Sequence, residues 1–301
     1  MNFAQLLFPD FSLILCGFLI CRFTPLGRGI WEPVESLVYY FLFPVLLFTS
    51  IVRSPLDVRE ASSLIGAGLA MGLCGIAMAY ALPYVPVLGR HIDRRDHAGA
   101  AQVAFRFNSF IALALAERLA DARGLQLIAV LIGFCVPLFN VGAVWPMARH
   151  GQSGFLRALI RNPLIVATAA GLAFNFAGLR IPAFAEPTLL RIGSASIALG
   201  LMTAGAGLHF ASMATNKALT VGVLSIRHFF TPLVGFLLSR AFGLDDVQTA
   251  ILLAFSALPT ASSSYVLAAR MGYNAPYVAG LVTLSTLLGI VSLPFALGLL
   301  R

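Results

Sequence analysis

Two short polar stretches interrupt the long apolar runs of this 301-residue sequence. The first, FRFNS, contains Arg106, Asn108 and Ser109. A guanidinium beside an amide suits a carboxylate, because the planar guanidinium can donate to both carboxylate oxygens at once. The alternative is that Arg106 extends to a membrane interface or pairs structurally with Glu117. The chemistry that this stretch indicates is recognition of a small organic anion.

The second polar stretch, ALPTASSSY, places a proline before a run of hydroxyl groups. Pro259 removes a backbone donor and obstructs the preceding helical turn, while the hydroxyls can bond backbone groups that a regular helix keeps paired. A helix broken at membrane depth is tolerated where the freed groups are buried in protein or line a watery cavity, as in transporter binding sites. A proline kink with a small-residue packing face is the alternative. The hydroxyl residues are Thr260, Ser262, Ser263 and Ser264.

Further polar residues lie within other apolar runs. We expect Arg227 to neutralise the carbonyls of a broken helix, since a cation is stabilised near the C-terminal carbonyls of a helix. Asn140 either completes the anion pocket or forms an interhelical hydrogen bond. Proton coupling would have to rest on Glu117, His209 or His228, whereas a sodium site could use backbone carbonyls and leave no trace in the sequence. Arg227 joins Glu117 and His228 among the candidate coupling residues.

The composition is that of an integral membrane protein. Hydrophobic residues make up 59% of the chain and charged residues only 11%, and the mean hydropathy is +0.90. A helix needs roughly 20 apolar residues to cross a bilayer. The apolar runs predict an all-α protein with ten transmembrane helices, at 5–23, 34–52, 62–86, 97–117, 125–147, 160–178, 188–209, 217–240, 246–270 and 275–300.

The sequence contains no enzyme signature. It has no HExxH, no GxSxG, no P-loop and no GxGxxG, so neither catalysis nor ATP-driven pumping is predicted. The four cysteines lack metal-ligand spacing, and no metal or cofactor is expected apart from a possible coupling Na⁺ or H⁺. The net charge of +8 is dispersed over short loops, which favours a lipid surface over nucleic acid as its partner.

An overlay of residue n on residue n+150 indicates two repeats, 1–150 and 151–301. It places Ala104-Phe105 on Ala254-Phe255 and aligns the two polar stretches. Because each half would hold five spans, an odd number, the second repeat must enter the membrane from the opposite side. The overlay therefore predicts a 5+5 inverted repeat in which broken helices four and nine meet near the midplane.

Two helix-softening positions lie outside the polar stretches. Pro44 lies in span two, and Gly200 lies in its counterpart in the second half. Either a gating role or simple packing accommodation would explain them. The basic residues of alternating loops divide ten against eight, which favours both termini outside the cytoplasm in a multi-pass protein of the cytoplasmic (inner) membrane.

Three segments resemble motifs of the auxin efflux carrier family, which includes plant auxin exporters and bacterial malonate-type and malate-type carriers. They are FRFNSFIALALAE, ALPTASSSYVLAARMGYN and FLFPVLLFTSI. The resemblance implies crossed, broken fourth and ninth helices. Spans 1, 2, 6 and 7 would form a scaffold and homodimer contact, and spans 3–5 and 8–10 a moving transport domain. The family's two asparagines fall on Asn108 and Asn140. Its crossover prolines fall on Ala114 and Ser264, so in this chain the serines and Pro259 must make the break.

The function that these features predict is secondary transport of a small mono- or dicarboxylate by alternating access, in an elevator-like manner. A passive anion channel is one alternative. An exporter of an amphipathic aromatic acid resembling auxin is another. A ligand-sensing receptor is disfavoured, because the sequence has no appended signalling domain.

Overall fold

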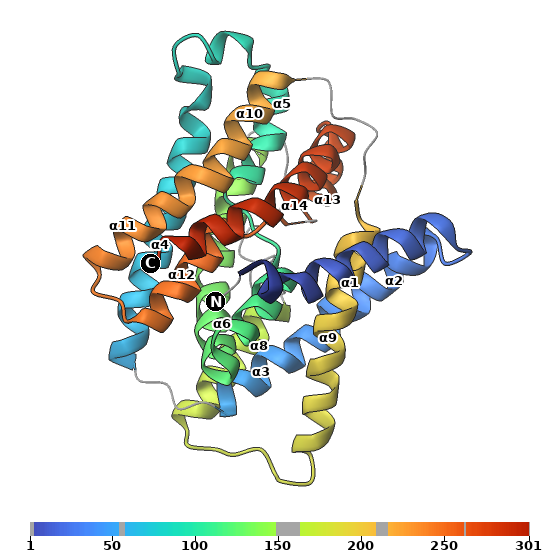
Figure 1. Cartoon of the computed structure of the whole chain (residues 1–301), viewed down its shortest axis with the longest axis vertical. Coiled ribbons are helices and arrows are strands. Elements are labelled where there is room, and N and C mark those ends of the chain that lie inside the picture. Colours follow the sequence, from blue (N-terminus) through green and yellow to red (C-terminus); the bar gives the residue numbers. More distant parts are fainter. Residues whose placement is uncertain (1–2, 54–57, 149–162, 209–215, 262, 301) are drawn as a thin grey trace. The chain divides into compact units, whose positions relative to one another are not determined.

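The computed structural model describes residues 3–53, 58–148, 163–208, 216–261 and 263–300 (Figure 1). All elements within these ranges are helical. Among the described residues, five stretches are long and apolar enough to cross a membrane, and two shorter apolar helices, Phe11–Phe23 and Asp246–Ala257, accompany them. The predicted all-α membrane class is thereby confirmed. The five stretches are Ser62–Tyr84, Arg94–Met147, Glu186–Ala206, Lys217–Ala241 and Ala275–Gly298.

The chain divides into two compact units that are discontinuous in sequence. Among described residues, the first unit holds 3–53, 58–65, 110–133 and 163–207. Its helices are α1 (Phe3–Phe23), α2 (Arg28–Leu37), η1 (Val38–Leu42), α3 (Phe43–Arg53), α8 (Pro163–Phe176), α9 (Glu186–Ala206), the start of α4 (Val58–Ala81) and the first part of α6 (Ser109–Ala148).

The second unit holds the remainder of α4, the last part of α6 and all helices after residue 208. Its other elements are η2 (Leu82–Tyr84), η3 (Gly89–His91), α5 (Arg94–Ala100), η4 (Ala101–Ala104), α10 (Lys217–Ser225), η5 (Ile226–Phe230), α11 (Thr231–Ala241), α12 (Asp246–Ala257), α13 (Ser263–Arg270) and α14 (Ala275–Gly298).

Within the first unit, α1 packs closely on α9 (Figure 1). A Cβ atom on Gly17 would overlap the carbonyl oxygen of Met202, and one on Gly205 would overlap the carbonyl oxygen of Ile14. The two helices therefore approach backbone to backbone, as small residues permit in membrane proteins.

Replacing Gly205 by alanine is expected to destabilise the first unit. The added methyl group can be accommodated only if one helix backbone shifts, and overpacking of this kind costs about 1–3 kcal/mol. Gly29→Ala in α2 is the matched control, because no atom lies within 4 Å of a Cβ built at that position. Thermal unfolding in detergent should show a lower midpoint for Gly205→Ala only. Equal midpoints would contradict the close approach.

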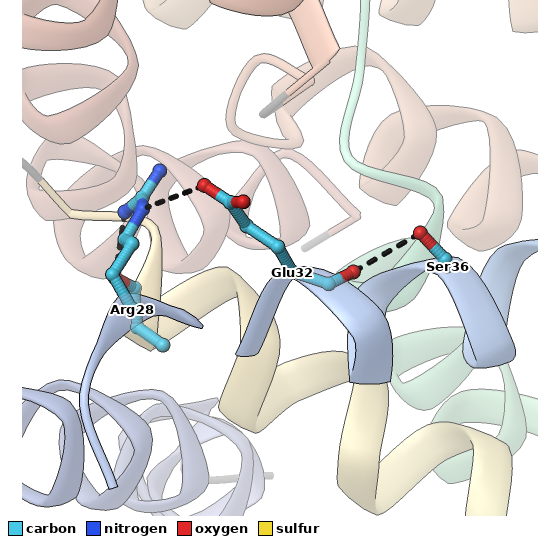
Figure 2. Close-up of polar contacts among 4 residues, drawn as sticks. Arg28, Glu32 and Ser36 are labelled. Carbon is cyan, nitrogen blue, oxygen red and sulfur yellow. Dashed lines mark hydrogen bonds and ion pairs between the residues drawn. The ribbon is translucent and has the colours of Figure 1, made fainter. Parts of the chain in front are cut away.

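Arg28 ties the start of α2 to the end of α9 in the first unit. Its Nη1 donates to the carbonyl oxygen of Ala206 over 2.9 Å, and its Nε lies 4.0 Å from a carboxylate oxygen of Glu32. Figure 2 shows this ion pair together with the hydrogen bond from the Ser36 hydroxyl to the Glu32 carbonyl oxygen, 3.0 Å long. A cation at the last carbonyls of a helix is favourable, because it opposes the negative end of the helix dipole.

A π-helical stretch precedes a proline in two places. The stretch η1 ends two residues before Pro44, and η5 ends two residues before Pro232. Proline lacks an N–H group and its ring crowds the carbonyl four residues earlier, so a wider turn accommodates it. Pro44 therefore lies at a local change of helix geometry. At Gly200, a Cβ would lie 2.9 Å from the Phe110 ring, which is a packing constraint.

Two predicted span boundaries differ from the structure. The second span, predicted over 34–52, is helical from residue 28 to residue 53, because its first turns are polar and do not register as an apolar run. The predicted loop between spans four and five is reduced to a sharp reversal within α6. There Ala120 has φ −154° and ψ 31°, and Asp121 has φ 46° and ψ −132°.

Candidate functional site

The ninth predicted span is interrupted after α12. This helix ends at Ala257, and Leu258 has φ −55° and ψ 143°, outside the helical region. Pro259 explains this conformation, because the ring of a proline disfavours helical geometry in the residue before it. The non-helical stretch continues through Ala261, and α13 begins at Ser263.

The fourth predicted span is also interrupted, although it contains no proline at that point. The short helix η4 ends at Ala104, residues 105–108 are non-helical and α6 begins at Ser109. Phe105 and Phe107 are buried, so side-chain packing holds this stretch in place.

The two interruptions are hydrogen-bonded to each other within the second unit. The Asn108 N–H donates to the Pro259 carbonyl oxygen over 2.8 Å. The buried Gln102 amide adds a second link, because its Nε2 donates to the carbonyl oxygens of Ser264 over 3.1 Å and of Gly99 over 2.9 Å. The ninth-span segment thus supplies carbonyl acceptors for two donors of the fourth span, which helps to meet the requirement that buried backbone groups be paired.

Arg227 places a positive charge where the two interruptions, residues 105–108 and 258–261, meet; this contact region is named the crossing. The Arg227 side chain is 1% exposed. Nε donates to the carbonyl oxygen of Leu258 over 2.5 Å, Nη2 to that of Phe255 over 3.2 Å and Nη1 to that of Phe105 over 3.4 Å. The guanidinium therefore serves carbonyls of both interruptions, which are negative because their helical partners are missing. This is the structural role that we expect of Arg227 from the sequence.

His228 links the ninth-span interruption to α14. Its Nδ1 lies 2.8 Å from the Ser292 hydroxyl, and its Nε2 lies 2.8 Å from the Ser285 hydroxyl. Ser285 also accepts from the Thr260 N–H over 2.9 Å, and Ser292 donates to the Ala257 carbonyl oxygen over 3.4 Å. Two serine hydroxyls of α14 thus connect the imidazole to the Thr260 N–H and to the Ala257 carbonyl oxygen.

Arg106 is half-buried at the start of this crossing. Its Nη1 donates to Oε1 of Gln102 over 2.9 Å. Thr260 precedes α13, and Ser264 lies in its first turn. The hydroxyl oxygens of both residues are fully buried and have no hydrogen-bond partner among the described residues. Buried hydroxyls are normally paired, so an unpaired one needs an explanation such as a bound ligand or water.

Aromatic rings surround the crossing. Phe107 and Phe255 meet edge to face with ring centroids 4.5 Å apart, and Phe139 stacks on Phe255 at 6.4 Å. Phe105 contacts Phe139 at 6.0 Å, and the Tyr80 hydroxyl donates to the Gly142 carbonyl oxygen. The polar groups are therefore set in an apolar shell, where charge interactions are stronger than in water.

The remaining predicted residues are distributed as follows. Ser109 is the first residue of α6, and Asn140 is half-buried on the same helix beside Phe139. Ser263 begins α13, whereas Ser262 and His209 lie outside the described residues. Ala114 is buried inside α6, so the fourth-span interruption precedes it.

Glu117 belongs to the first unit and lines a pocket there of about 170 Å³. Arg53 also lines it and pairs with Glu186 over 3.0 Å. Across the described part of the chain, no group of three or more His, Cys, Asp or Glu side chains could hold a metal ion. The pocket is lined by Leu46, Thr49, Arg53, Glu117, Asp121, Ala122, Leu125, Leu189, Leu190, Gly193, Ser194 and Ile197.

Three residues of the crossing are not predicted from the sequence. Gln102 lies four residues before Arg106, a spacing that brings side chains together on a helix. Ser285 and Ser292 are seven residues apart, so they share one face of α14. These spacings are the available signals, but both are common in helices and do not identify a site.

Comparison with known proteins gives three matches. A family model described as "Membrane transport protein" matches residues 146–297, half of the chain. A protein of Methanothermobacter thermautotrophicus named "Uncharacterized transporter" is 23% identical over 286 residues, which cover 94% of this chain and 93% of that protein. A protein of Rhizobium meliloti named "Putative malonate transporter" is 23% identical over 315 residues, which cover 98% of this chain and 95% of that protein.

Proposed function

We propose that this chain, which belongs to the auxin efflux carrier family of membrane transport proteins, is a secondary carrier of a small organic anion. It would act by alternating access in the cytoplasmic membrane, with ten membrane-spanning helices in two inverted five-helix repeats and both termini outside the cytoplasm. The observation that carries the proposal is the hydrogen-bonded pair of helix interruptions in the second unit. Broken helices of this kind form the binding sites of many secondary transporters.

Arg106 is the proposed carboxylate-binding residue. A half-buried guanidinium can exchange water for substrate, and Gln102 already fixes one of its donors at 2.9 Å. The planar group presents paired donors to both oxygens of a carboxylate. Asn108, Ser109 and Asn140 would complete the polar wall on the side of the fourth and fifth spans.

The ninth-span interruption would supply the opposing donors. The positive end of the helix dipole at the N-terminus of α13 favours an anion. Thr260 and Ser264 contribute buried hydroxyls that are unpartnered among the described residues, and the sequence predicts the same role for Ser262 and Ser263. A carboxylate between Arg106 and the Thr260 and Ser264 hydroxyls would give these two hydroxyls a hydrogen-bond partner.

The division into two units supports an elevator-like mechanism. Predicted spans one, two, six and seven fall in the first unit, and spans eight to ten fall in the second with the crossing. In this proposal spans 3–5 and 8–10 form the moving transport domain, although residues 110–133 of spans four and five group with the first unit. Spans 1, 2, 6 and 7 form the scaffold through which two copies would form a homodimer.

Malonate and malate are the first substrates to test, because one relative carries the name of a malonate transporter. Purified protein in liposomes is supplied with labelled malonate, malate or indole acetate, and initial uptake is measured. Imposed proton or sodium gradients in the same assay test coupling. Preference for indole acetate would assign the carrier to amphipathic aromatic acids instead.

Arg106→Ala is expected to raise the KM for the transported anion about tenfold to a hundredfold, since a hydrogen bond to a charged group contributes about 1.5–3 kcal/mol. Arg240→Ala is the matched control, because Arg240 is exposed on α11 and lies over the Phe236 ring. Its KM should equal that of the wild type. Undiminished uptake by a correctly inserted Arg106→Ala protein would refute the anion-binding role of Arg106.

A further inference from the structure

The ninth-span interruption is bridged by a chain of hydrogen bonds through three side chains. It runs from the Thr260 N–H to Ser285, from Ser285 to His228, from His228 to Ser292 and from Ser292 to the Ala257 carbonyl oxygen. All three are buried, with exposed fractions of 0% for Ser285, 9% for His228 and 6% for Ser292. Two backbone groups that a continuous helix would pair internally are thus paired through α14 and η5 instead.

The two ends of this chain fix its direction. A backbone N–H can only donate, so Ser285 accepts from Thr260; a carbonyl can only accept, so Ser292 donates its one hydroxyl hydrogen to Ala257. Ser292 must then accept from Nδ1 of His228. In a neutral imidazole the other ring nitrogen is an acceptor, and Ser285 has a hydroxyl hydrogen to donate to it. Every donor meets an acceptor only if the ring carries its single proton on Nδ1.

We propose that His228 is a positioning residue for the anion site, holding Thr260 in place through Ser285. The Thr260 hydroxyl is fully buried and has no partner among the described residues, whereas its N–H is committed to Ser285. With the backbone of Thr260 fixed, that hydroxyl remains available to donate to a substrate oxygen. This inference deepens the proposed function and, for its transport readout, rests on it.

The two hydrogen bonds that His228 makes, one to Ser285 and one to Ser292, can be tested separately. The amide of asparagine reaches the position of Nδ1, so His228→Asn retains a donor to Ser292 and loses the link to Ser285. The longer glutamine reaches the position of Nε2, so His228→Gln retains an acceptor for Ser285 and loses the link to Ser292. Ser285→Ala and Ser292→Ala remove the same two links from the α14 side, with little change in volume.

The expected result is a pattern in KM for labelled malonate uptake into proteoliposomes. Ser285→Ala and His228→Asn should raise KM about tenfold, whereas Ser292→Ala and His228→Gln should remain within about threefold of the wild type. A uniform loss of activity in all four variants, or no change in any of them, would overturn the positioning role, because His228 would then act through packing alone or not at all.

A spectroscopic measurement tests the hydrogen-bond chain through His228 independently of transport. In ¹⁵N-histidine-labelled protein, the His228 signals are identified by their loss in His228→Gln. Nε2 should resonate as an unprotonated imidazole nitrogen, and Nδ1 as a protonated one. The opposite tautomer would overturn the proposed direction of the hydrogen bonds through His228. Absence of anion uptake by the wild type combined with the expected tautomer would refute the proposed function but not the hydrogen-bond chain.

Discussion

Replacing Arg227 by leucine is expected to abolish transport and to lower the thermal stability of the protein markedly. The guanidinium donates to the carbonyl oxygens of Leu258, Phe255 and Phe105. Leaving a buried acceptor unpaired costs about 1–3 kcal/mol, and three are left here. Leucine avoids the desolvation cost of a buried cation, which is several kcal/mol, but it also leaves a cavity. We expect the losses to prevail because this one side chain donates to carbonyl oxygens of both interruptions.

Arg227→Lys is the informative companion variant. It keeps the charge, but a compact ammonium on a flexible stem cannot match the three-way geometry of a guanidinium. Its melting temperature in detergent, followed by tryptophan fluorescence, should lie between those of the wild type and Arg227→Leu. Arg106→Ala should lower the melting temperature less than Arg227→Leu does, because it removes the bond to Oε1 of Gln102 and not bonds to three buried carbonyls, while it also loses affinity. Wild-type stability and transport in Arg227→Leu would contradict the structural role of Arg227.

Gln102→Leu is expected to reduce transport efficiency, Vmax/KM, more than a hundredfold. The Gln102 amide accepts from Arg106 and donates to the carbonyl oxygens of Ser264 and Gly99. One of these bonds involves a charge, so together they contribute about 2.5–6 kcal/mol. Loss of the amide both releases Arg106 from its orientation and breaks a link between the two interrupted helices.

Gln126→Leu provides the matched control for this variant. Gln126 is also a buried amide, 6% exposed, but it belongs to the first unit and not to the crossing. Uptake assays should show a KM close to that of the wild type for Gln126→Leu, whatever its effect on stability. Equal losses of efficiency in the two variants would mean that the effect of Gln102 is general destabilisation.

The ninth-span interruption could be predicted from the sequence because its cause is local. Pro259 disfavours helical geometry at Leu258 and removes its own N–H, whatever the surrounding fold. The fourth-span interruption has no such cause. Residues 105–108 contain neither proline nor glycine, and their conformation depends on the bond from Asn108 to Pro259 and on Arg227. The internal overlay predicts the position of this break, but only tertiary contacts explain it.

The polar partners of the predicted residues could not be predicted for a related reason. Serines in an apolar helix usually bond the carbonyl of the preceding turn, so Ser285 and Ser292 have no distinguishing local pattern. Their role arises because α14 places both beside His228, 57 and 64 residues away in sequence. Gln102 is similar, since its link to Ser264 spans 162 residues.

Counterflow in proteoliposomes tests most directly whether this protein is a carrier with a substrate site at the crossed interruptions. Vesicles preloaded with unlabelled anion are diluted into a trace of labelled anion, and accumulation of the label is followed. We predict a transient overshoot that saturates with internal concentration and is lost in Arg106→Ala. Label that merely equilibrates without an overshoot, accompanied by large unitary currents in planar bilayers, would contradict the account and identify a passive pore.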